Sequence, residues 1–254
     1  MNSLPSINPK EEVSKISVFI KDVFKKQNIQ QVVIALSGGV DSGASLALLS
    51  RSIPKENILA LHMPYFKEDD HVEDLVRFVG LPEKSYKNLQ IEKMVNGIIE
   101  ELDISEDDKL RRGNIGVRVR MIILYDFAKK VNGLVCGTEN RSENLLGYYT
   151  RFGDEASDLE PILHLYKTQV YELAKYLDLP SSILNKPPAA GLWETQTDEE
   201  ELGFSYKEAD PVLYLYFDRN KSIEEIEKME FSNARKIIEF AKKNSYKHHT
   251  PYKL

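Results

Sequence analysis

The chain has 254 residues, 42% apolar and 29% charged, a composition typical of a globular protein with a sizeable core. Its net charge of −6 and pI of about 5.5 argue against a general nucleic-acid or membrane-surface binder, since such proteins are usually basic. The single cysteine, Cys136, excludes an internal disulfide and a multi-thiolate metal site. No apolar run approaches the roughly 18 residues of a membrane span, and residues 1–13 do not resemble an export signal, so we expect a cytoplasmic protein.

The first half of the chain alternates strand-like and helical patterns. Residues 9–28 fit an amphipathic helix with a stripe of Val13, Ile16, Ile20 and Val23. Apolar strand-like runs follow at 31–36, 57–63, 84–89 and 133–138. Helical patterns lie at 42–51, 69–79, 90–101 and 113–131. This alternation predicts an α/β fold, a doubly wound and mostly parallel sheet with helices on both faces.

The second half of the chain lacks this alternation of strand-like and helical patterns. Residues 185–204 combine prolines, glycines and acidic residues without a clear period, and irregular stretches of that length are usually functional or disordered. Helical patterns return over about 205–243, and a basic tail closes the chain. No internal repeat or low-complexity linker interrupts it. We therefore expect one domain over residues 1–254, with a C-terminal helical portion and tail at about 205–254.

The string SGGVDS, residues 37–42, stands where the first predicted strand passes into a helix. Gly38 and Gly39 let the backbone approach a ligand, and the following helix N-terminus favours phosphate. The spacing differs from that of a P-loop, so no lysine of that motif is present. A strand–helix turn capped by Ser42 is the simpler interpretation. The complete string, however, resembles the pyrophosphate-binding loop of the N-type ATP pyrophosphatases.

Two further segments carry candidate ligand groups. In residues 113–131, Arg118 and Arg120 point to different faces of a helix whose neighbouring residues are apolar, so we expect an anionic partner rather than a solvated helix end. The strand that ends at Cys136 brings Thr138 to the carboxyl edge of the sheet, and we expect the cysteine itself to be a small buried residue. Glu143 follows about one helical turn later, close enough to share a cation with Asp41, and Mg²⁺ needs only one or two carboxylates.

Several longer motifs occur in the order found in ammonia-dependent NAD synthetases. They are SGGVDS, GNIGVRVRM, GTENRSENLLGYYTRFGD, LYKTQV, KPPAAGLWETQTDEEELG and SYKHHTP. The resemblance covers about residues 12–252, and its middle motifs are specific to that family rather than to all N-type pyrophosphatases. By this resemblance the fold is adenine nucleotide alpha hydrolase-like.

The resemblance implies roles for individual positions. It implies catalytic roles for Asp41, Glu143 and Lys167, with Asp41 and Glu143 as magnesium ligands. It implies ATP contacts for Ser37, Gly38, Gly39, Val40, Asp41, Ser42, Thr138, Lys167 and Ala189. It implies deamido-NAD contacts for Arg118, Arg151, Asp158, Tyr246 and Lys247.

Three positions depart from the family pattern. Arg151 stands where many members have lysine, which keeps the charge but changes its geometry. Tyr246 replaces a histidine, so a ring remains without an imidazole proton donor. Ala189 stands where a hydroxyl side chain often contacts ATP, so we expect that contact to be missing.

The implied reaction amidates deamido-NAD with ammonia and consumes ATP with Mg²⁺, giving NAD, AMP and pyrophosphate through an acyl-adenylate. We expect residues 65–70 and 185–204 to act as a lid, and a homodimer that completes the deamido-NAD site. The family motifs fill the chain and leave no amidase segment, so free ammonia rather than glutamine is the expected donor.

Two alternatives remain open from sequence. An RNA-thiolating pyrophosphatase would need a basic face and usually extra cysteines. A non-catalytic nucleotide-binding regulator would not need a pair of magnesium ligands.

Overall fold

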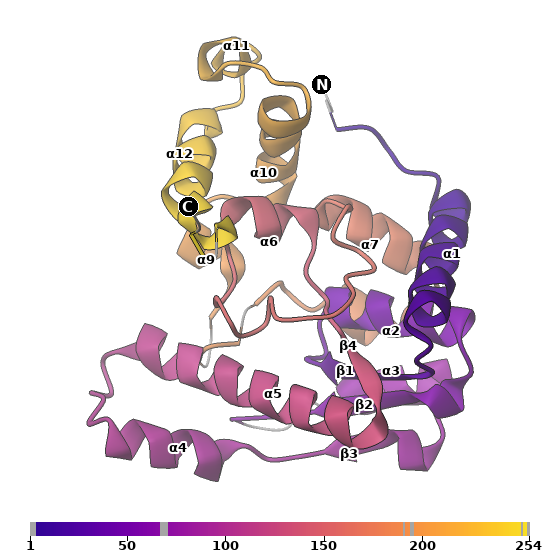
Figure 1. The fold of residues 1–254 in the computed structure, drawn as a ribbon. Helices are drawn as coiled ribbons and strands as arrows, with labels where there is room; N and C mark the ends of the chain where they lie inside the picture. Colours follow the sequence, from indigo (N-terminus) through magenta and orange to yellow (C-terminus); the bar gives the residue numbers. More distant parts are fainter. Residues whose placement is uncertain (1–3, 67–70, 190, 194–195, 250, 253–254) are drawn as a thin grey trace.

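The computed structural model describes residues 4–66, 71–189, 191–193, 196–249 and 251–252. Its centre is a four-stranded parallel sheet in the order β3-β2-β1-β4 (Figure 1). The strands are β1 (Gln31–Leu36), β2 (Ile58–His62), β3 (Tyr86–Asn88) and β4 (Gly133–Cys136). The chain moves from β1 outward to β2 and β3, and returns to place β4 on the other side of β1. The junction of β1 and β4 is therefore the switch point beyond which ligands of such sheets bind.

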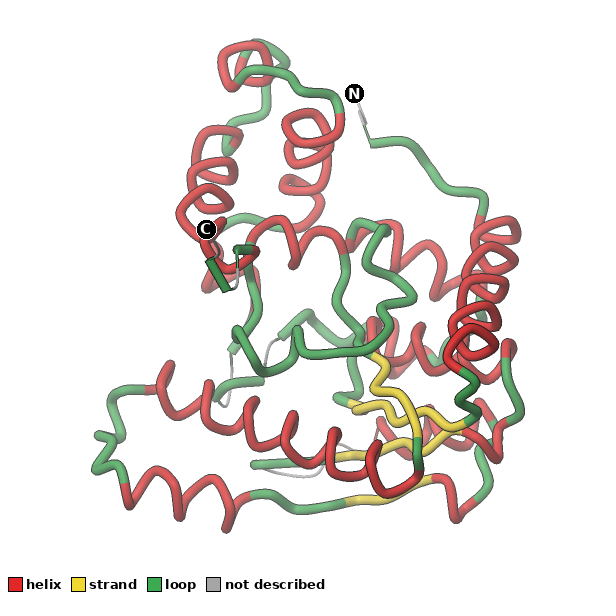
Figure 2. Tube along the Cα trace, in the orientation of Figure 1, coloured by secondary structure: helices red, strands yellow, loops and turns green. Residues whose placement is uncertain are grey.

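Both faces of the sheet are covered by helices, as the sequence predicted (Figure 2). Alternate residues of β1 point to opposite faces, so Val32 and Ile34 pack in one apolar cluster while Val33 packs in another. The first face is covered by α1 (Pro9–Gln27), α2 (Val40–Ser52), α3 (His71–Val79), α7 (Lys167–Tyr176) and α8 (Ser181–Leu184). The second face is covered by α4 (Glu92–Glu101) and α5 (Lys109–Val131). The prediction of a doubly wound α/β fold is confirmed.

Local signals explain where the long helices begin and end. The Asn8 side chain accepts a hydrogen bond from the Glu11 amide at the start of α1, and Pro9 occupies its first turn. Asn28 ends α1 in the left-handed conformation, with φ of 52°, and Asn132 ends α5 in the same way. Helix α5 begins at Lys109, four residues before the expected start at 113, and Asp108 caps it by accepting the Arg111 amide.

A third apolar cluster lies in the C-terminal part of the chain. It is formed by α6 (Arg141–Leu146), α9 (Asp198–Leu202), α10 (Tyr206–Leu213), a π-helix η3 (Tyr214–Asp218), α11 (Ile223–Glu227) and α12 (Ala234–Asn244). Figure 1 shows α10, α11 and α12 at the end of the molecule opposite α4, with α6 and α7 between them and the sheet. Short 3₁₀ turns occur at Lys55–Asn57, Glu83–Ser85 and Ser245–His248.

One expectation about the loops is corrected. Residues 185–204 were expected to be irregular throughout, but α9 lies within them, and Leu202 and Phe204 are buried in the C-terminal cluster. Only the part before α9 remains an irregular segment. Of the other expected lid, residues 67–70 lie outside the described residues. None of the helices that the structure describes is long and apolar enough to cross a membrane.

Candidate active site at the junction of β1 and β4

The loop after β1 is closed by its own hydroxyl groups. Ser42 Oγ donates to the Gly39 carbonyl at 3.1 Å and accepts the Ser37 amide at 3.3 Å. Gly38 has φ of +74°, a conformation that favours glycine. Gly39 is the N-cap of α2 and supplies no side chain to its first amides. The loop therefore presents a helix N-terminus to the switch point, as phosphate binding requires.

Asp41 and Glu143 meet at this point, as the sequence predicted, and Lys167 joins them. Lys167 Nζ lies 2.5 Å from Asp41 Oδ2 and 2.9 Å from Glu143 Oε1. Asn140 holds the two acids together, because its amide donates to Asp41 Oδ1 at 2.9 Å and its carbonyl oxygen accepts the Glu143 amide at 3.0 Å. Three chain segments thus converge, from α2, α6 and α7.

Burial sets the charges of this group. It raises the pKa of Glu143 to about 7, although the Lys167 ammonium opposes the rise. Burial alone would lower the pKa of Lys167, but Asp41 and Glu143 outweigh it and raise that pKa above its usual value, so the ammonium stays charged. Lys167 is 4% exposed, which makes the pairing of its charge obligatory.

The two carboxylates suit the part of a magnesium coordination shell that a protein supplies. Asp41 and Glu143 both approach one cationic atom, so their oxygens converge on a single point. Among the described residues no three or more His, Cys, Asp or Glu side chains form a metal-binding group. Two carboxylates are enough for Mg²⁺ when substrate phosphates and water complete its shell.

Sequence patterns did not reveal the residues that enclose Lys167 from the C-terminal side. The Tyr206 ring lies 5.2 Å from Lys167 Nζ, and the Tyr206 hydroxyl donates to Asp198 Oδ2 at 3.0 Å. Asp198 is almost completely buried. The string TDEEEL that contains it is typical of a solvated acidic run. Asp198 is buried, unlike its acidic neighbours, because α9 packs against α10.

A second acidic pair, also missed from sequence, lies beside the first. Glu160 Oε2 accepts the Glu139 amide at 3.0 Å, and Oε1 accepts the Ser157 hydroxyl at 2.8 Å. Burial raises the pKa of Glu139 to about 9 and that of Glu160 to about 8. A Cβ at Gly137 would lie 1.7 Å from Glu160 Oε1, so a side chain there would displace the Glu160 carboxyl group. Burial therefore favours the protonated form of both carboxyl groups of this pair.

Two residues that depart from the family pattern contact each other. The Arg151 guanidinium lies 5.6 Å from the centre of the Tyr246 ring, and Arg118 donates to the Arg151 carbonyl at 3.2 and 3.3 Å. The structure therefore gathers these three predicted residues. Arg120 also donates to a carbonyl, that of Met63, at 2.9 Å, so both arginines have backbone partners, and the expected anionic partner stays a prediction.

Lys247 and Asp158 have backbone partners. Lys247 Nζ donates to the Gly147 carbonyl at 2.6 Å and to the Tyr149 carbonyl at 2.7 Å. Asp158 Oδ2 accepts the Val135 amide at 2.7 Å, at the edge of β4. The first contact ties the tail to the loop after α6, and the second ties the loop after Arg151 to the sheet.

Two further residues for which the sequence predicted ATP contacts are at least partly exposed. Thr138 is half-buried just after β4, and Ala189 is exposed. Lys186, which the sequence analysis did not single out, donates from Nζ to the Ser37 carbonyl at 3.2 Å. It brings a positive charge from the segment before α9 to the loop of residues 37–42. Cys136 is buried, as expected, and burial raises the pKa of its thiol well above the usual value.

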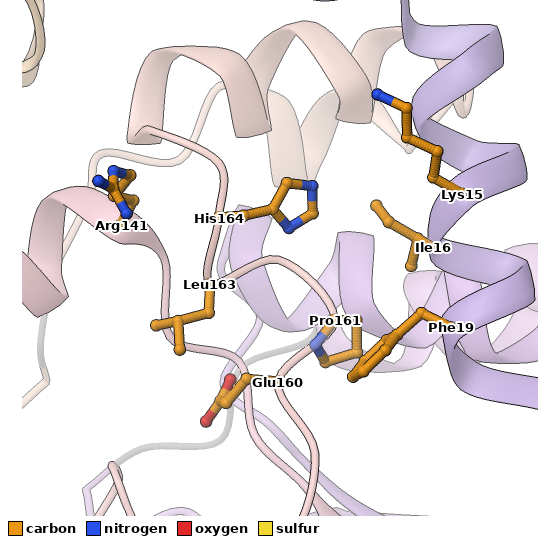
Figure 3. Close-up of a pocket in the computed structure, with 8 residues that line it drawn as sticks. All are labelled: Lys15, Ile16, Phe19, Arg141, Glu160, Pro161, Leu163 and His164. Carbon is orange, nitrogen blue, oxygen red and sulfur yellow. The ribbon is translucent and has the colours of Figure 1, made fainter. Parts of the chain in front are cut away.

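A hollow of about 370 Å³ lies elsewhere, between α1 and the segment after β4 (Figure 3). Figure 3 shows Lys15, Ile16 and Phe19 of α1 on one side and His164 and Pro161 across from them. It borders the site through Arg141 and Glu160 but includes none of the loop, carboxylate or lysine residues described above. This hollow is therefore distinct from the cluster of loop, carboxylate and lysine residues at the junction of β1 and β4.

The parallel sheet, covered by helices on both faces, belongs to an α/β protein with the adenine nucleotide alpha hydrolase-like fold, the fold of its structural neighbours. The model of the NAD synthase family matches residues 12–251, and the chain belongs to that family. It is similar to the NH(3)-dependent NAD(+) synthetase of Thermoplasma acidophilum, with 44% identity over 96% of this chain and 97% of the relative. From this similarity we conclude that the protein is an NH₃-dependent NAD synthetase, which is a ligase.

Solved structures agree with this placement. The NMN synthetase of Francisella tularensis has a TM-score of 0.83 and 30% identity, covering 98% of this chain and 99% of that one. The NH3-dependent NAD synthetase of Campylobacter jejuni has a TM-score of 0.80 and 31% identity, covering 98% of this chain and all of that one.

Proposed function

We propose that this enzyme amidates deamido-NAD with ammonia at the expense of ATP and Mg²⁺, through an acyl-adenylate. The observation that carries the proposal is the meeting of Asp41, Glu143 and Lys167 beside the glycine loop. A site of opposed charges next to a phosphate-binding helix end suits a triphosphate with its metal ion. A purely regulatory nucleotide binder has no need of this pair.

The reaction balances in two steps. The nicotinate carboxylate of deamido-NAD attacks the α-phosphorus of ATP, a new carboxyl–phosphorus bond forms, and pyrophosphate leaves. Ammonia then attacks the acyl carbon, AMP departs, and one proton is released as the amide forms. Neither step needs a protein nucleophile, so catalysis consists of positioning and charge stabilisation.

Each group of site residues has a separate role in this reaction. The loop amides of residues 37–42 hold phosphates, and Lys167 neutralises charge that develops on them. Asp41 and Glu143 would hold Mg²⁺, which when bound offsets phosphate charge. The cluster of Arg118, Arg151 and Tyr246 offers a cationic and aromatic surface for the dinucleotide. The segment that carries Lys186 covers the loop and excludes water from the activated acid.

The test is direct formation of NAD. Purified protein is incubated with ATP, Mg²⁺, deamido-NAD and ammonium, and NAD is measured with a coupled dehydrogenase while AMP and pyrophosphate are quantified. One AMP and one pyrophosphate per NAD are expected. ADP and phosphate as products, or NAD formation without ATP, would rule out the acyl-adenylate.

A second acceptor must be compared, because one of the similar structures is an NMN synthetase. Nicotinate mononucleotide is offered in parallel with deamido-NAD, and kcat/KM is measured for each. We expect the dinucleotide to be preferred. A higher kcat/KM for the mononucleotide would reassign the substrate while leaving the reaction class unchanged.

The nitrogen donor is tested in the same assay. Ammonium should support the reaction, and the total ammonium required should fall as the pH rises, because the neutral amine is the nucleophile. Glutamine free of ammonium should not replace it. Efficient NAD formation by this chain with glutamine alone would contradict the proposal.

A further inference from the structure

Asp210 of α10 has no solvent exposure, and both of its carboxylate oxygens accept hydrogen bonds. Its Oδ1 accepts the Ser142 hydroxyl at 2.6 Å. Its Oδ2 accepts both the amide and the hydroxyl of Thr168, at 2.8 and 2.7 Å. Ser142 Oγ in turn accepts the Lys167 amide at 2.8 Å. One buried side chain from α10 therefore bonds to α6 and to α7.

The residues it holds are the immediate neighbours of two site residues. Ser142 directly precedes Glu143, and Thr168 directly follows Lys167. We propose that Asp210 is a positioning residue, which fixes the separation of Glu143 and Lys167 by clamping the first turns of α6 and α7. The proposal rests on the proposed function for its kinetic part only, since the clamp itself can be measured without turnover.

Physical chemistry explains why a carboxylate occupies this place. The first amides of a helix have no partner within the helix, and those of Lys167 and Thr168 lie in the first turn of α7. A buried carboxylate is costly unless its oxygens are bonded, and here both oxygens are used. Because the donors come from two helices, the bonds are satisfied together only when α6 and α7 have one relative position.

That position matters for the chemistry. Lys167 Nζ is within hydrogen-bonding distance of Glu143, and a displacement of about 1 Å at a catalytic group can cost about 100-fold in rate. A side chain that only stabilised the hydrophobic core would not need to bond to Ser142 and Thr168, the neighbours of Glu143 and Lys167. Helix α10 would therefore position Glu143 and Lys167 relative to each other, although it supplies none of the expected metal ligands.

The experiment compares Asp210→Asn with Val212→Ala, a volume-reducing change on the same helix in the same apolar cluster. The asparagine side chain retains its size and one acceptor, but the Ser142 hydroxyl loses its acceptor. Hydrogen exchange is followed by mass spectrometry in a peptide covering residues 166–170, and kcat and KM are measured for ATP and deamido-NAD.

In Asp210→Asn we expect exchange over 166–170 to accelerate about tenfold or more and kcat to fall at least tenfold, with KM for deamido-NAD within twofold of wild type. Val212→Ala should lower the melting temperature and leave kcat and this exchange unchanged. Ser142→Ala should reproduce the kcat loss, and the double variant should lose little more, because both changes break one chain of bonds.

Unchanged exchange in Asp210→Asn, or equal kcat losses in the Val212→Ala control, would overturn the proposal. If Asp210→Asn does not fold, Ser142→Ala decides the same question. A wild-type protein that makes no NAD would refute the proposed function, while the exchange result would still decide the clamp.

Discussion

At the scale of single residues, Lys167 occupies the point that the two acids share. With its ammonium within 2.9 Å of both carboxylates, the lysine balances charges that burial would otherwise make costly. Under the proposed function, a bound triphosphate would offer this ammonium a second anionic partner.

Asp41→Asn and Glu143→Gln should each preserve the fold and lower kcat about 100-fold or more, equivalent to roughly 3 kcal/mol of transition-state stabilisation. Each change removes one negative charge from the proposed metal site with little change in volume. Steady-state kinetics over a range of Mg²⁺ concentrations measures the effect. Glu12→Gln is the matched control, since Glu12 is another buried carboxylate with a lysine partner, Lys15, remote from the loop. Near-normal turnover at modest Mg²⁺ would remove the altered residue from the metal site.

The acidic pair behind this site makes stability depend on pH. Burial raises the folded-state pKa of Glu160 to about 8, from 4.5 in a free side chain. Between these values the folded protein keeps a proton that the unfolded chain releases, so the free energy of unfolding falls as pH rises, by at most about 1.4 kcal/mol per pH unit for one group. The stabilising contribution is full below pH 4.5 and is lost as pH rises through about 8.

Glu160→Gln should flatten this dependence. The glutamine carbonyl can accept the Glu139 amide, and its NH₂ group can donate to Ser157, so both contacts of the pair have a replacement. Urea unfolding at about pH 5 and about pH 8 measures the slope. The variant should gain stability relative to wild type at the higher pH. Parallel curves for the two proteins would show that Glu160 ionises normally in the folded state.

At the scale of elements, residues 185–204 divide into two parts. The part before α9 touches the phosphate loop through Lys186, whereas α9 itself is packed against the C-terminal cluster. Gln196 and Asp198 are buried at its start. A lid formed by this stretch, as the sequence predicted, would therefore be restricted to the part before α9, and α9 would anchor it.

Ligands should protect residues 185–189 from hydrogen exchange and leave 198–204 unchanged, because the second segment is already buried. The comparison is made by mass spectrometry with and without ATP and deamido-NAD. Lys186→Met should reduce the protection of the first segment, since it removes the contact with the Ser37 carbonyl. Equal exchange of 185–189 in both states would exclude closure over the nucleotide.

At the scale of the whole molecule, several large apolar side chains remain exposed. Leu110 and Ile122 of α5 are 55% and 59% exposed, and Phe152, which follows Arg151, is 55% exposed. Large apolar side chains on a protein surface are candidates for contact with a partner. The family resemblance independently leads us to expect a homodimer.

Sedimentation should therefore find a dimer at micromolar concentration. Ile122→Lys should shift it towards monomer and raise KM for deamido-NAD, because a charge would be desolvated in the contact. Met229→Lys changes an exposed apolar residue of the C-terminal layer and should do neither. A fully active monomeric wild-type protein would defeat the prediction.

The order of strands and helices was readable from the sequence because buried parallel strands and amphipathic helices have different apolar periods. The glycine loop was readable for a similar local reason, since only glycine suits the backbone at Gly38. The pairing of Asp41 with Glu143 also followed from sequence, because both come just after neighbouring strands of a parallel sheet. The strand and helix order and the glycine loop depend on residues close together in the chain, whereas the pairing of Asp41 with Glu143 depends on the alignment of two parallel strands.

Only the tertiary structure decided which charged residues are buried. The sequence string around Asp198 resembles a surface run, Glu139 and Glu160 are separated along the chain, and Asp210 lies beside a proline in a short helix. Their burial depends on how α9 and α10 pack against α6 and α7, and on how the segment after β4 folds back against Gly137. Such contacts join distant segments, so local patterns carry no signal for them, whereas the sheet and its loop are set by patterns that lie within each segment.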